Sequence, residues 1–476
     1  MRKKFRGERI TLQQIEITDA GAEGKAIARH EGKVIFITNA VPGDIADVLV
    51  TRSKKSFMEG KATYFHHLSD KRATPFCEHF GFCGGCKWQH LQYPHQLFYK
   101  QKQVVDNFER IGKVAMPEIR TIIASDKETE YRNKLEYTFS DYRWLTDEDM
   151  QSPDRAEMNM NALGFHIAQH FDRVLDLNHC YLQAEPSNLI RNSVKAFCIE
   201  HGFTFYNPRH HTGFLRNLII RNTTLGETMA IMIFGEAHAE NQAALLNHIL
   251  KIYPTLTSLM FVVNTKLNDT IADLDIQCFH GQSYITERLG SLEFRIGPVS
   301  FFQTNSRQAM RMYDLVKEFA AIAPTDTVWD LYTGTGTIAN YVARDARKVI
   351  GIEYVSSSVE DARINSSLNQ ITNTEFIAGD MAKILTADFV AAYGKPDVII
   401  TDPPRNGMHP DVVAQMMAAA PKRIVYVSCN PATQARDLAI LCESYTITAV
   451  QPLDMFPHTH HVENIVLLEL RSVPSL

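Results

Sequence analysis

The 476-residue chain lacks any long hydrophobic run, and this bounds what it can be. A membrane-spanning helix needs about 18 unbroken apolar residues, and no stretch of the sequence approaches that length. A basic start at residues 1–4 could open a signal peptide, but residues 7–9 read Gly-Glu-Arg where an apolar segment should follow. We therefore expect a cytoplasmic protein with no membrane partner.

Cysteine is scarce and neither sign of charge dominates. With 8 Cys in 476 residues a disulfide framework is excluded, so clustered cysteines are left for metal binding or chemistry. The 49 Lys and Arg nearly balance 54 Asp and Glu, and a content of 45% hydrophobic and 22% charged residues is typical of globular proteins. At about 150 residues per domain, the length suggests roughly three domains.

The near-neutral total conceals an uneven distribution of charge. Residues 1–75 hold 14 basic and 9 acidic side chains, a net of +5, whereas the rest holds 35 and 45, a net of −10. Short apolar segments separated by turns, such as 33–37 and 45–50, predict a small β-barrel at the N-terminus. A small basic barrel on an acidic body fits a polyanion-binding appendage, although an ordinary solvated surface gives the same pattern.

The rest of the chain reads as α/β. Residues 96–290 are mixed, with a polar stretch at 146–155 expected to be an exposed loop and strands expected at 214–221, 228–234 and 259–263. From about 295 onward strands and helices alternate, which predicts a parallel sheet. Its expected strands are 327–331, 348–352, 375–378, 397–401 and 423–427, with a closing strand at 464–470.

The first strand of this sheet runs into a glycine-rich turn, DLYTGTGTI (330–338). Glycines there let a ligand approach the backbone beside a helix N-terminus. Glu353 and Asp380 end the next two strands, where they can accept hydrogen bonds from a ribose and an adenine amino group. NAD and S-adenosylmethionine both fit this geometry. A dinucleotide fingerprint requires a third glycine, and Asn340 lies near that place instead, so the turn is closer to the methyltransferase version.

Two more strands bring reactive side chains to the same edge. Asp402 ends the fourth strand, and the two prolines after it cannot continue a sheet. Cys429 ends the fifth strand beside backbone donors that we expect to lower its pKa, although a lone cysteine is as often a small core residue. Glu463 opens the last strand, at the edge of the sheet, and could serve as a base or be a plain turn residue. Three histidines in the preceding loop, 456–463, lack the partner carboxylates of a metal site.

A group of cysteines lies far from these strands in sequence. Cys77, Cys83 and Cys86 fall within ten residues, and Cys180 can close a set of four thiolates. Four thiolates suit zinc or an iron–sulfur cluster, and spacing alone does not choose between them. A coincidental group of core cysteines is the remaining alternative.

The C-terminal third resembles the RNA uracil-5-methyltransferases that act on ribosomal RNA and tRNA. Five strings carry the resemblance in order: FFQTNSRQA (301–309), DLYTGTGTI (330–338), DPPRNG (402–407), SCNP (428–431) and FPHTHHVE (456–463). Upstream, YRNKLEY (131–137) and LRNLIIR (215–221) extend it, and residues 1–65 resemble the TRAM domain, a small RNA-binding barrel. Two departures, Thr333 where relatives often carry Cys and Asn464 after the glutamate, alter no group that the chemistry needs.

The resemblance implies an α/β protein in three parts. These are an OB-like TRAM barrel over 1–66, a mixed α/β central domain with the cysteine cluster and an RNA-binding surface over 67–290, and a Rossmann-like methyltransferase domain over 291–476. It implies that Cys429 adds to carbon 6 of a uracil and that Glu463 removes the proton from carbon 5. The residues that it implies contact S-adenosylmethionine are Gln303, Tyr332, Thr337, Glu353, Asp380 and Asp402.

The cysteine pattern carries a further implication. Ribosomal-RNA members of the family hold a four-iron–four-sulfur cluster at this pattern, which favours that cluster over zinc on Cys77, Cys83, Cys86 and Cys180. We expect it to join the central domain to the linker, since methyl transfer needs no electrons. Relatives with the cluster mostly modify large-subunit ribosomal RNA, so 23S ribosomal RNA is the expected substrate and tRNA the alternative, with no obligate protein partner evident.

Two rival functions remain open at this point. The first is a non-catalytic RNA-binding or ribosome-assembly protein that keeps the fold, which the intact Cys429 and Glu463 disfavour. The second is a nicotinamide-dependent oxidoreductase, which the missing third glycine disfavours.

Overall fold

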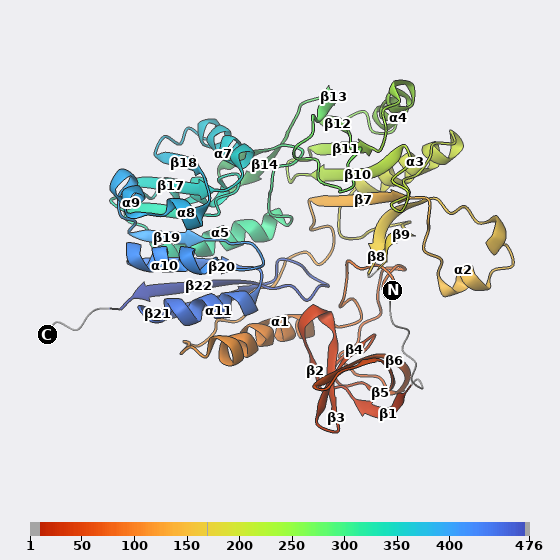
Figure 1. Ribbon diagram of the computed structural model, residues 1–476, viewed down its shortest axis with the longest axis horizontal. Coiled ribbons are helices and arrows are strands. Elements are labelled where there is room, and N and C mark those ends of the chain that lie inside the picture. The colour runs from red at the N-terminus through yellow and green to blue at the C-terminus, as the bar shows by residue number, and fades with distance from the viewer. Residues whose placement is uncertain (1–9, 169, 472–476) are drawn as a thin grey trace.

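A computed structural model describes residues 10–168 and 170–471 of the chain. It contains three large β-sheets, one in the N-terminal barrel, one in the centre of the chain and one in the C-terminal part (Figure 1). The basic start at residues 1–4 lies outside the described residues. Among the described helices, none is long and apolar enough to cross a membrane.

The N-terminal segment forms the expected barrel. Its strands pair in the order β1-β5-β6-β4-β3-β2, and alternate side chains such as Ile35, Ile37 and Val48 are fully buried inside it. The last strand was not predicted, because Gly60 and several polar residues interrupt its alternation. The strands are β1 (Thr11–Glu16), β2 (Asp19–Ala20), β3 (Ala26–His30), β4 (Lys33–Thr38), β5 (Ile45–Ser53) and β6 (Phe57–His67).

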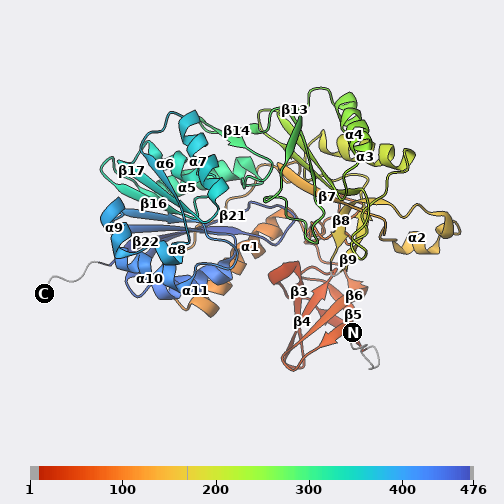
Figure 2. The same cartoon turned by 45° about the horizontal axis from the view of Figure 1, so that its top comes forward.

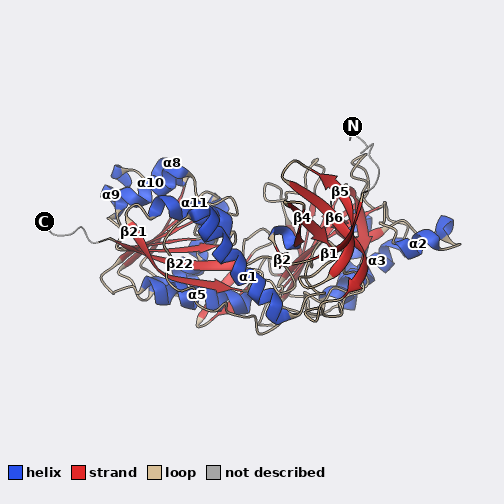
Figure 3. Ribbon diagram, turned by 90° about the horizontal axis from the view of Figure 1, so that it is seen from below, coloured by secondary structure: helices blue, strands red, loops and turns tan. Residues whose placement is uncertain are grey.

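Helix α1 (Tyr93–Asn107) lies between the barrel and the C-terminal sheet (Figure 3). On one side Trp88 and Tyr99 pack with Val41 of the barrel. Farther along, Val104 joins the core beneath the C-terminal sheet. Helix α1 falls within residues 67–290, which the sequence assigned to the central domain. Its side chains nevertheless connect the barrel to the C-terminal sheet.

The central sheet has seven strands in the order β13-β12-β11-β10-β7-β8-β9, and only β11 and β12 pair in parallel. Helices α3 and α4 lie side by side over one face (Figure 2). The three strands expected here are confirmed as β10, β11 and β12. The expected loop at 146–155 contains a short helix instead, because Thr146 and Asp149 form a reciprocal capping box. The elements are β7 (Lys134–Ser140), α2 (Asp147–Gln151), β8 (Ala162–Ile167), β9 (His170–Asp176), α3 (Ser187–Glu200), β10 (Leu215–Asn222), β11 (Thr228–Phe234), α4 (Ala239–Ile252), β12 (Ser258–Val263) and β13 (Gln277–Gly281).

The C-terminal sheet follows the order β18-β17-β16-β19-β20-β22-β21, and its first five strands run parallel. All six expected strands are confirmed. An unpredicted strand, β21, forms the edge beyond β22, so the expectation that Glu463 opens an edge strand is wrong. A β14–β15 hairpin joins this part to the central sheet. The strands are β14 (Ile285–Leu289), β15 (Leu292–Ile296), β16 (Thr327–Leu331), β17 (Lys348–Glu353), β18 (Thr374–Ala378), β19 (Val398–Thr401), β20 (Arg423–Ser428), β21 (Tyr445–Leu453) and β22 (Glu463–Leu470).

Helices cover both faces of this sheet. Alternate strand residues face opposite ways, so that Val328 packs toward α5, α6 and α7 whereas Trp329 packs toward α9, α10 and α11. Parallel strands buried on both sides are the doubly wound α/β arrangement that the alternation predicted. The helices are α5 (Ser306–Ala320), α6 (Thr337–Ala343), α7 (Ser356–Leu368), α8 (Met381–Ile384), α9 (Ala387–Tyr393), α10 (Pro410–Ala419) and α11 (Pro431–Leu441).

Candidate active site

The carboxyl ends of the parallel strands open into a cavity of about 1130 Å³. This is the edge at which open α/β sheets bind ligands. Most of the residues expected to act in catalysis or donor binding line it: Gln303, Tyr332, Glu353, Asp380, Asp402, Cys429 and Glu463. Thr337 is not among the lining residues. It opens α6, and its hydroxyl lies 3.1 Å from the Tyr313 hydroxyl.

The glycine-rich turn has the shape that a bound ligand requires. Tyr332, Gly334 and Gly336 all have left-handed φ angles, of 63°, 55° and 74°. A side chain at Gly336 would place its Cβ 2.8 Å from Ala362 Cβ, so only glycine fits. Glu353 accepts a hydrogen bond from the Gly334 N–H at 3.1 Å. Its carboxylate is therefore fixed beside the turn, with lone pairs left for a ligand.

Asp330 braces the same turn and was not recognised from the sequence as a site residue. Its Oδ2 accepts hydrogen bonds from the Thr333 hydroxyl at 2.5 Å and from the Ala339 N–H at 3.0 Å. Burial raises the pKa of this carboxyl to about 7. The only signal in the sequence was its place at the start of the DLYTGTGTI string.

Two carboxyls and a thiol line the cavity together: Glu463 is buried, whereas Asp402 and Cys429 are half-buried. Burial raises the pKa of Asp402 to about 7. Burial, with a smaller contribution from Asp402, raises the pKa of Glu463 to about 8. Burial also raises the pKa of the Cys429 thiol to about 12, and the two neighbouring carboxylates add to it. The expectation of a lowered thiol pKa is therefore wrong, because burial and negative neighbours outweigh the local donors.

Arg405 is a cavity residue that the sequence reasoning did not single out, although it lies in the DPPRNG string. Its charge lowers the pKa of Cys429 and of Glu463 against the rise that burial causes. Its Nη2 donates a hydrogen bond to His461 Nδ1 at 2.5 Å. A positive charge is thus held beside both proposed reactive groups. Nearby, Gln303 Nε2 donates to Asp402 Oδ2 at 3.4 Å.

Comparison with known proteins identifies the family. The model of the tRNA (uracil-5-)-methyltransferase family matches residues 274–471, and that of the TRAM domain matches residues 6–63. Proteins described as uncharacterized RNA methyltransferases of Bacteroides thetaiotaomicron and Porphyromonas gingivalis are 54% and 50% identical. These matches cover 94% and 95% of this chain and 100% and 99% of the relatives. The chain belongs to the RNA uracil-5-methyltransferase family.

A solved structure agrees with this assignment. The Pyrococcus abyssi tRNA (uracil-54, C5)-methyltransferase in complex with S-adenosyl-L-homocysteine is 27% identical, with a TM-score of 0.73, over 95% of this chain and 100% of that one. The expected TRAM barrel, α/β fold and methyltransferase class are confirmed. The oxidoreductase alternative is thereby removed.

The enzyme has another, smaller cavity of about 270 Å³ between residues 77–89 and the central sheet. Its lining includes Cys77, Cys83, Cys86 and Cys180. Burial raises the pKa of all four thiols, to about 11 for Cys83 and about 12 for Cys86. Within residues 10–168 and 170–471, no group of three or more His, Cys, Asp or Glu side chains is arranged to hold a metal ion. Arg132 lines this cavity and the larger one.

Proposed function

We propose that the enzyme transfers the methyl group of S-adenosylmethionine to carbon 5 of a uridine in RNA, with Cys429 as nucleophile and Glu463 as base. The observation that carries the proposal is that both residues line one cavity with the glycine turn and the acids at the strand ends. A target base in structured RNA must be flipped out to reach such a cavity.

The donor would bind along the strand ends. Glu353 would accept from the ribose hydroxyls and Asp380 from the adenine amino group, with Tyr332 of the turn lining the same part of the cavity. Gln303 and Asp402, which are hydrogen-bonded to one another, would contact the methionine part and the uracil. Thr337 would support the turn through its contact with Tyr313 rather than line the cavity. The positive sulfonium would lower the pKa values of the buried acids and thiol.

The chemistry follows from the weak nucleophilicity of carbon 5. After Cys429 loses its proton to solvent, its sulfur bonds to carbon 6 and the electron pair moves into an enolate. Carbon 5 then attacks the methyl carbon, whose bond to sulfur breaks and leaves S-adenosylhomocysteine. The Glu463 carboxylate takes the proton from carbon 5, the carbon 5–carbon 6 double bond re-forms, and the sulfur leaves carbon 6.

For the substrate we propose 23S ribosomal RNA in the cytoplasm, on the basis of the four-cysteine pattern. A tRNA is the second candidate, supported by the likeness to the Pyrococcus abyssi tRNA enzyme. The TRAM barrel would hold the surrounding RNA through its phosphates.

For the small cavity we propose a four-iron–four-sulfur cluster on Cys77, Cys83, Cys86 and Cys180, with zinc as the less favoured occupant. Four thiols, one buried and three half-buried, line a space of about 270 Å³, which is room for a group larger than one ion. The iron would supply the positive charge that keeps the four sulfurs as thiolates.

The test is methyl transfer to total RNA from cells that lack the gene, using the pure enzyme and methyl-labelled S-adenosylmethionine. We expect label at carbon 5 of a large-subunit uridine, lost in Cys429→Ala and kept in Cys442→Ala, whose half-buried thiol lies outside the cavity. Label confined to tRNA would keep the chemistry and overturn the ribosomal target. Absence of label with the donor bound would overturn the catalytic proposal.

A further inference from the structure

We propose that Lys100 and Gln96 on helix α1 are positioning residues for the reaction, because they hold the segment that carries the base into the cavity. This segment, residues 454–462, joins β21 to β22 and is called the base loop below. The inference rests on the proposed role of Glu463, which follows the loop directly. It assigns a task to two buried polar side chains that take no part in the chemistry described above.

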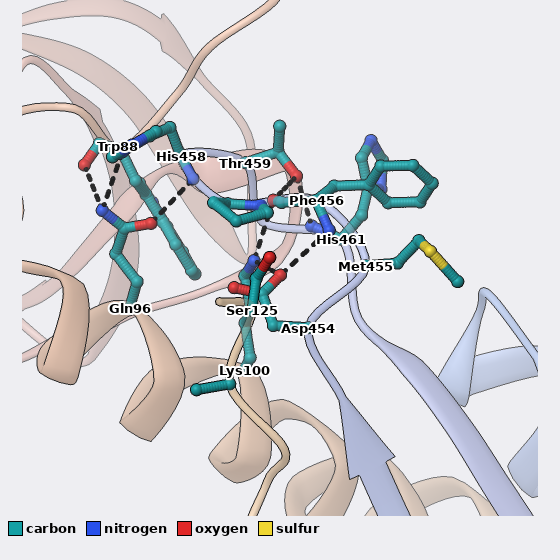
Figure 4. Close-up of polar contacts among 12 residues, drawn as sticks. Trp88, Gln96, Lys100, Ser125, Asp454, Met455, Phe456, His458, Thr459 and His461 are labelled. Carbon is teal, nitrogen blue, oxygen red and sulfur yellow. Dashed lines mark hydrogen bonds and ion pairs between the residues drawn. The ribbon is translucent and has the colours of Figure 1, made fainter. Parts of the chain in front are cut away.

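The first contact is an ion pair inside the protein. Lys100 Nζ lies 2.5 Å from Asp454 Oδ1, and both side chains are 0% exposed. The same ammonium donates to the Phe456 carbonyl at 3.0 Å, and Asp454 Oδ1 accepts from the Phe456 N–H at 3.0 Å (Figure 4). A buried ion pair recovers its desolvation cost only in a fixed geometry. Lys100 therefore fixes the turn at the start of the base loop.

The second contact fixes the middle of the loop. Gln96 Oε1 accepts a hydrogen bond from the His458 N–H at 2.8 Å, and Gln96 Nε2 lies 3.2 Å from His458 Nδ1 (Figure 4). His458 has a left-handed φ of 63°, which a side-chain-bearing residue adopts only where its surroundings impose it. Gln96 supplies that constraint, and its Nε2 is itself fixed by donating to the Trp88 and Leu91 carbonyls.

The segment that follows Cys86 holds the other side of the same residue. The N–H groups of Lys87 and Trp88 both donate to the His458 carbonyl, at 2.8 and 3.0 Å. Phe76, directly before Cys77, packs edge-on against the His458 ring at 5.1 Å. Thus His458 is held by α1 and by the cysteine segment, both outside the C-terminal sheet.

The far end of the loop reaches the reactive groups. His461 accepts the hydrogen bond from Arg405, and Glu463 begins β22 two residues later. Both residues line the catalytic cavity. A shift in the middle of the loop would therefore move the base relative to Cys429, while the glycine turn and its acids, on other strands, stay in place.

The test separates the base step from the steps before it. With 5-fluorouridine in the substrate RNA, carbon 5 carries no proton to remove, so the covalent adduct with Cys429 reports addition and methyl transfer alone. With ordinary uridine, turnover also needs the base. In the double variant Lys100→Met/Asp454→Asn, which leaves no unpaired buried charge, we expect wild-type adduct formation on fluorinated RNA. We expect turnover to fall about 10- to 100-fold, a share of the roughly 10²- to 10⁴-fold that a positioned base supplies.

A second readout is specific to the base. The double variant should accumulate a methylated, detergent-stable protein–RNA adduct on ordinary uridine, because elimination is slowed. Lys102→Met is the matched control, since this lysine of the same helix pairs with Asp19 and Asp106 and does not touch the base loop. It should keep wild-type turnover.

Other outcomes would count against the inference. A parallel fall of adduct formation and turnover, or no change in either, would overturn it. If the double variant does not fold, adduct formation on fluorinated RNA and turnover on ordinary uridine are compared in Gln96→Met instead. Failure of the wild-type enzyme to form any adduct with fluorinated RNA would overturn the proposed function itself, and the positioning role with it.

Discussion

Arg405 and His461 are joined by a hydrogen bond of 2.5 Å between the loop after β19 and the loop before β22. Because a guanidinium only donates, His461 must accept at Nδ1 and carry its own proton on Nε2. Burial, together with nearby cations, lowers the pKa of His461 to about 3, so the ring stays neutral. Arg405 thus remains the charged partner beside the thiol and the base.

This relationship predicts how Arg405 controls the pH dependence of the first step. In Arg405→Gln, the pKa values of Cys429 and Glu463 should rise further, because the charge that lowers both is removed. Each unit of pKa is a tenfold change in the thiolate fraction. We expect adduct formation with fluorinated RNA at neutral pH to fall about tenfold, and its pH profile to shift upward. Arg405→Lys should recover part of the rate, whereas an unshifted profile in Arg405→Gln would contradict the assignment.

A second prediction concerns stability and the buried Glu463. The pKa of its carboxyl is 4.5 when free and about 8 in the fold, so protonation of this carboxyl stabilises the folded state. The stability that it contributes is complete below the free pKa and is lost as the pH rises through the folded pKa. Between about pH 5 and about pH 8, the melting temperature of Glu463→Gln should fall less than that of the wild type. At about pH 8 the variant should melt a few degrees higher than the wild type. Glu443→Gln, at an exposed position, is the control. Equal slopes in Glu463→Gln and the wild type would contradict the prediction.

A third prediction isolates the close packing of the glycine turn. Gly336 and Gly202 have similar positive φ angles, of 74° and 66°, but a Cβ would meet a neighbour at 2.8 Å only at Gly336, since nothing lies within 4 Å of the position at Gly202. Substitution of either glycine by alanine should lower the free energy of unfolding by about 1 kcal/mol, because a Cβ strains a backbone with positive φ. Only Gly336→Ala should also weaken binding of S-adenosylhomocysteine, measured by calorimetric titration. Equal loss of affinity in the two variants would contradict a packing role for the turn.

The sequence allowed the cavity to be predicted because its residues end strands of one parallel sheet. Asp402 and Cys429 follow recognisable apolar strands, and parallel strands bring their carboxyl ends to one edge. The pKa of Cys429 could not be predicted in the same way, since the burial that mainly raises it, and the carboxylates that add to the rise, both depend on how separate strands pack. The pairing of Lys100 with Asp454 left no local pattern either, because 354 residues separate the partners. Strand β21 was missed because Gln451 and Pro452 break its apolar alternation.

The last prediction concerns the four-cysteine cavity. Cys83→Ser should remove one of four sulfurs that surround the proposed cluster, so bound iron and its visible absorbance should both be lost. Because Lys87 and Trp88 hold the base loop and follow Cys86 directly, the melting temperature should also fall by several degrees. Cys278→Ser is the matched control, since that exposed thiol lies on β13, outside the cavity. A purified protein with zinc in place of iron would overturn the cluster and keep the structural role. A colourless Cys83→Ser variant with wild-type activity and melting temperature would overturn both, because the thiols would then support neither a metal group nor the loop beside it.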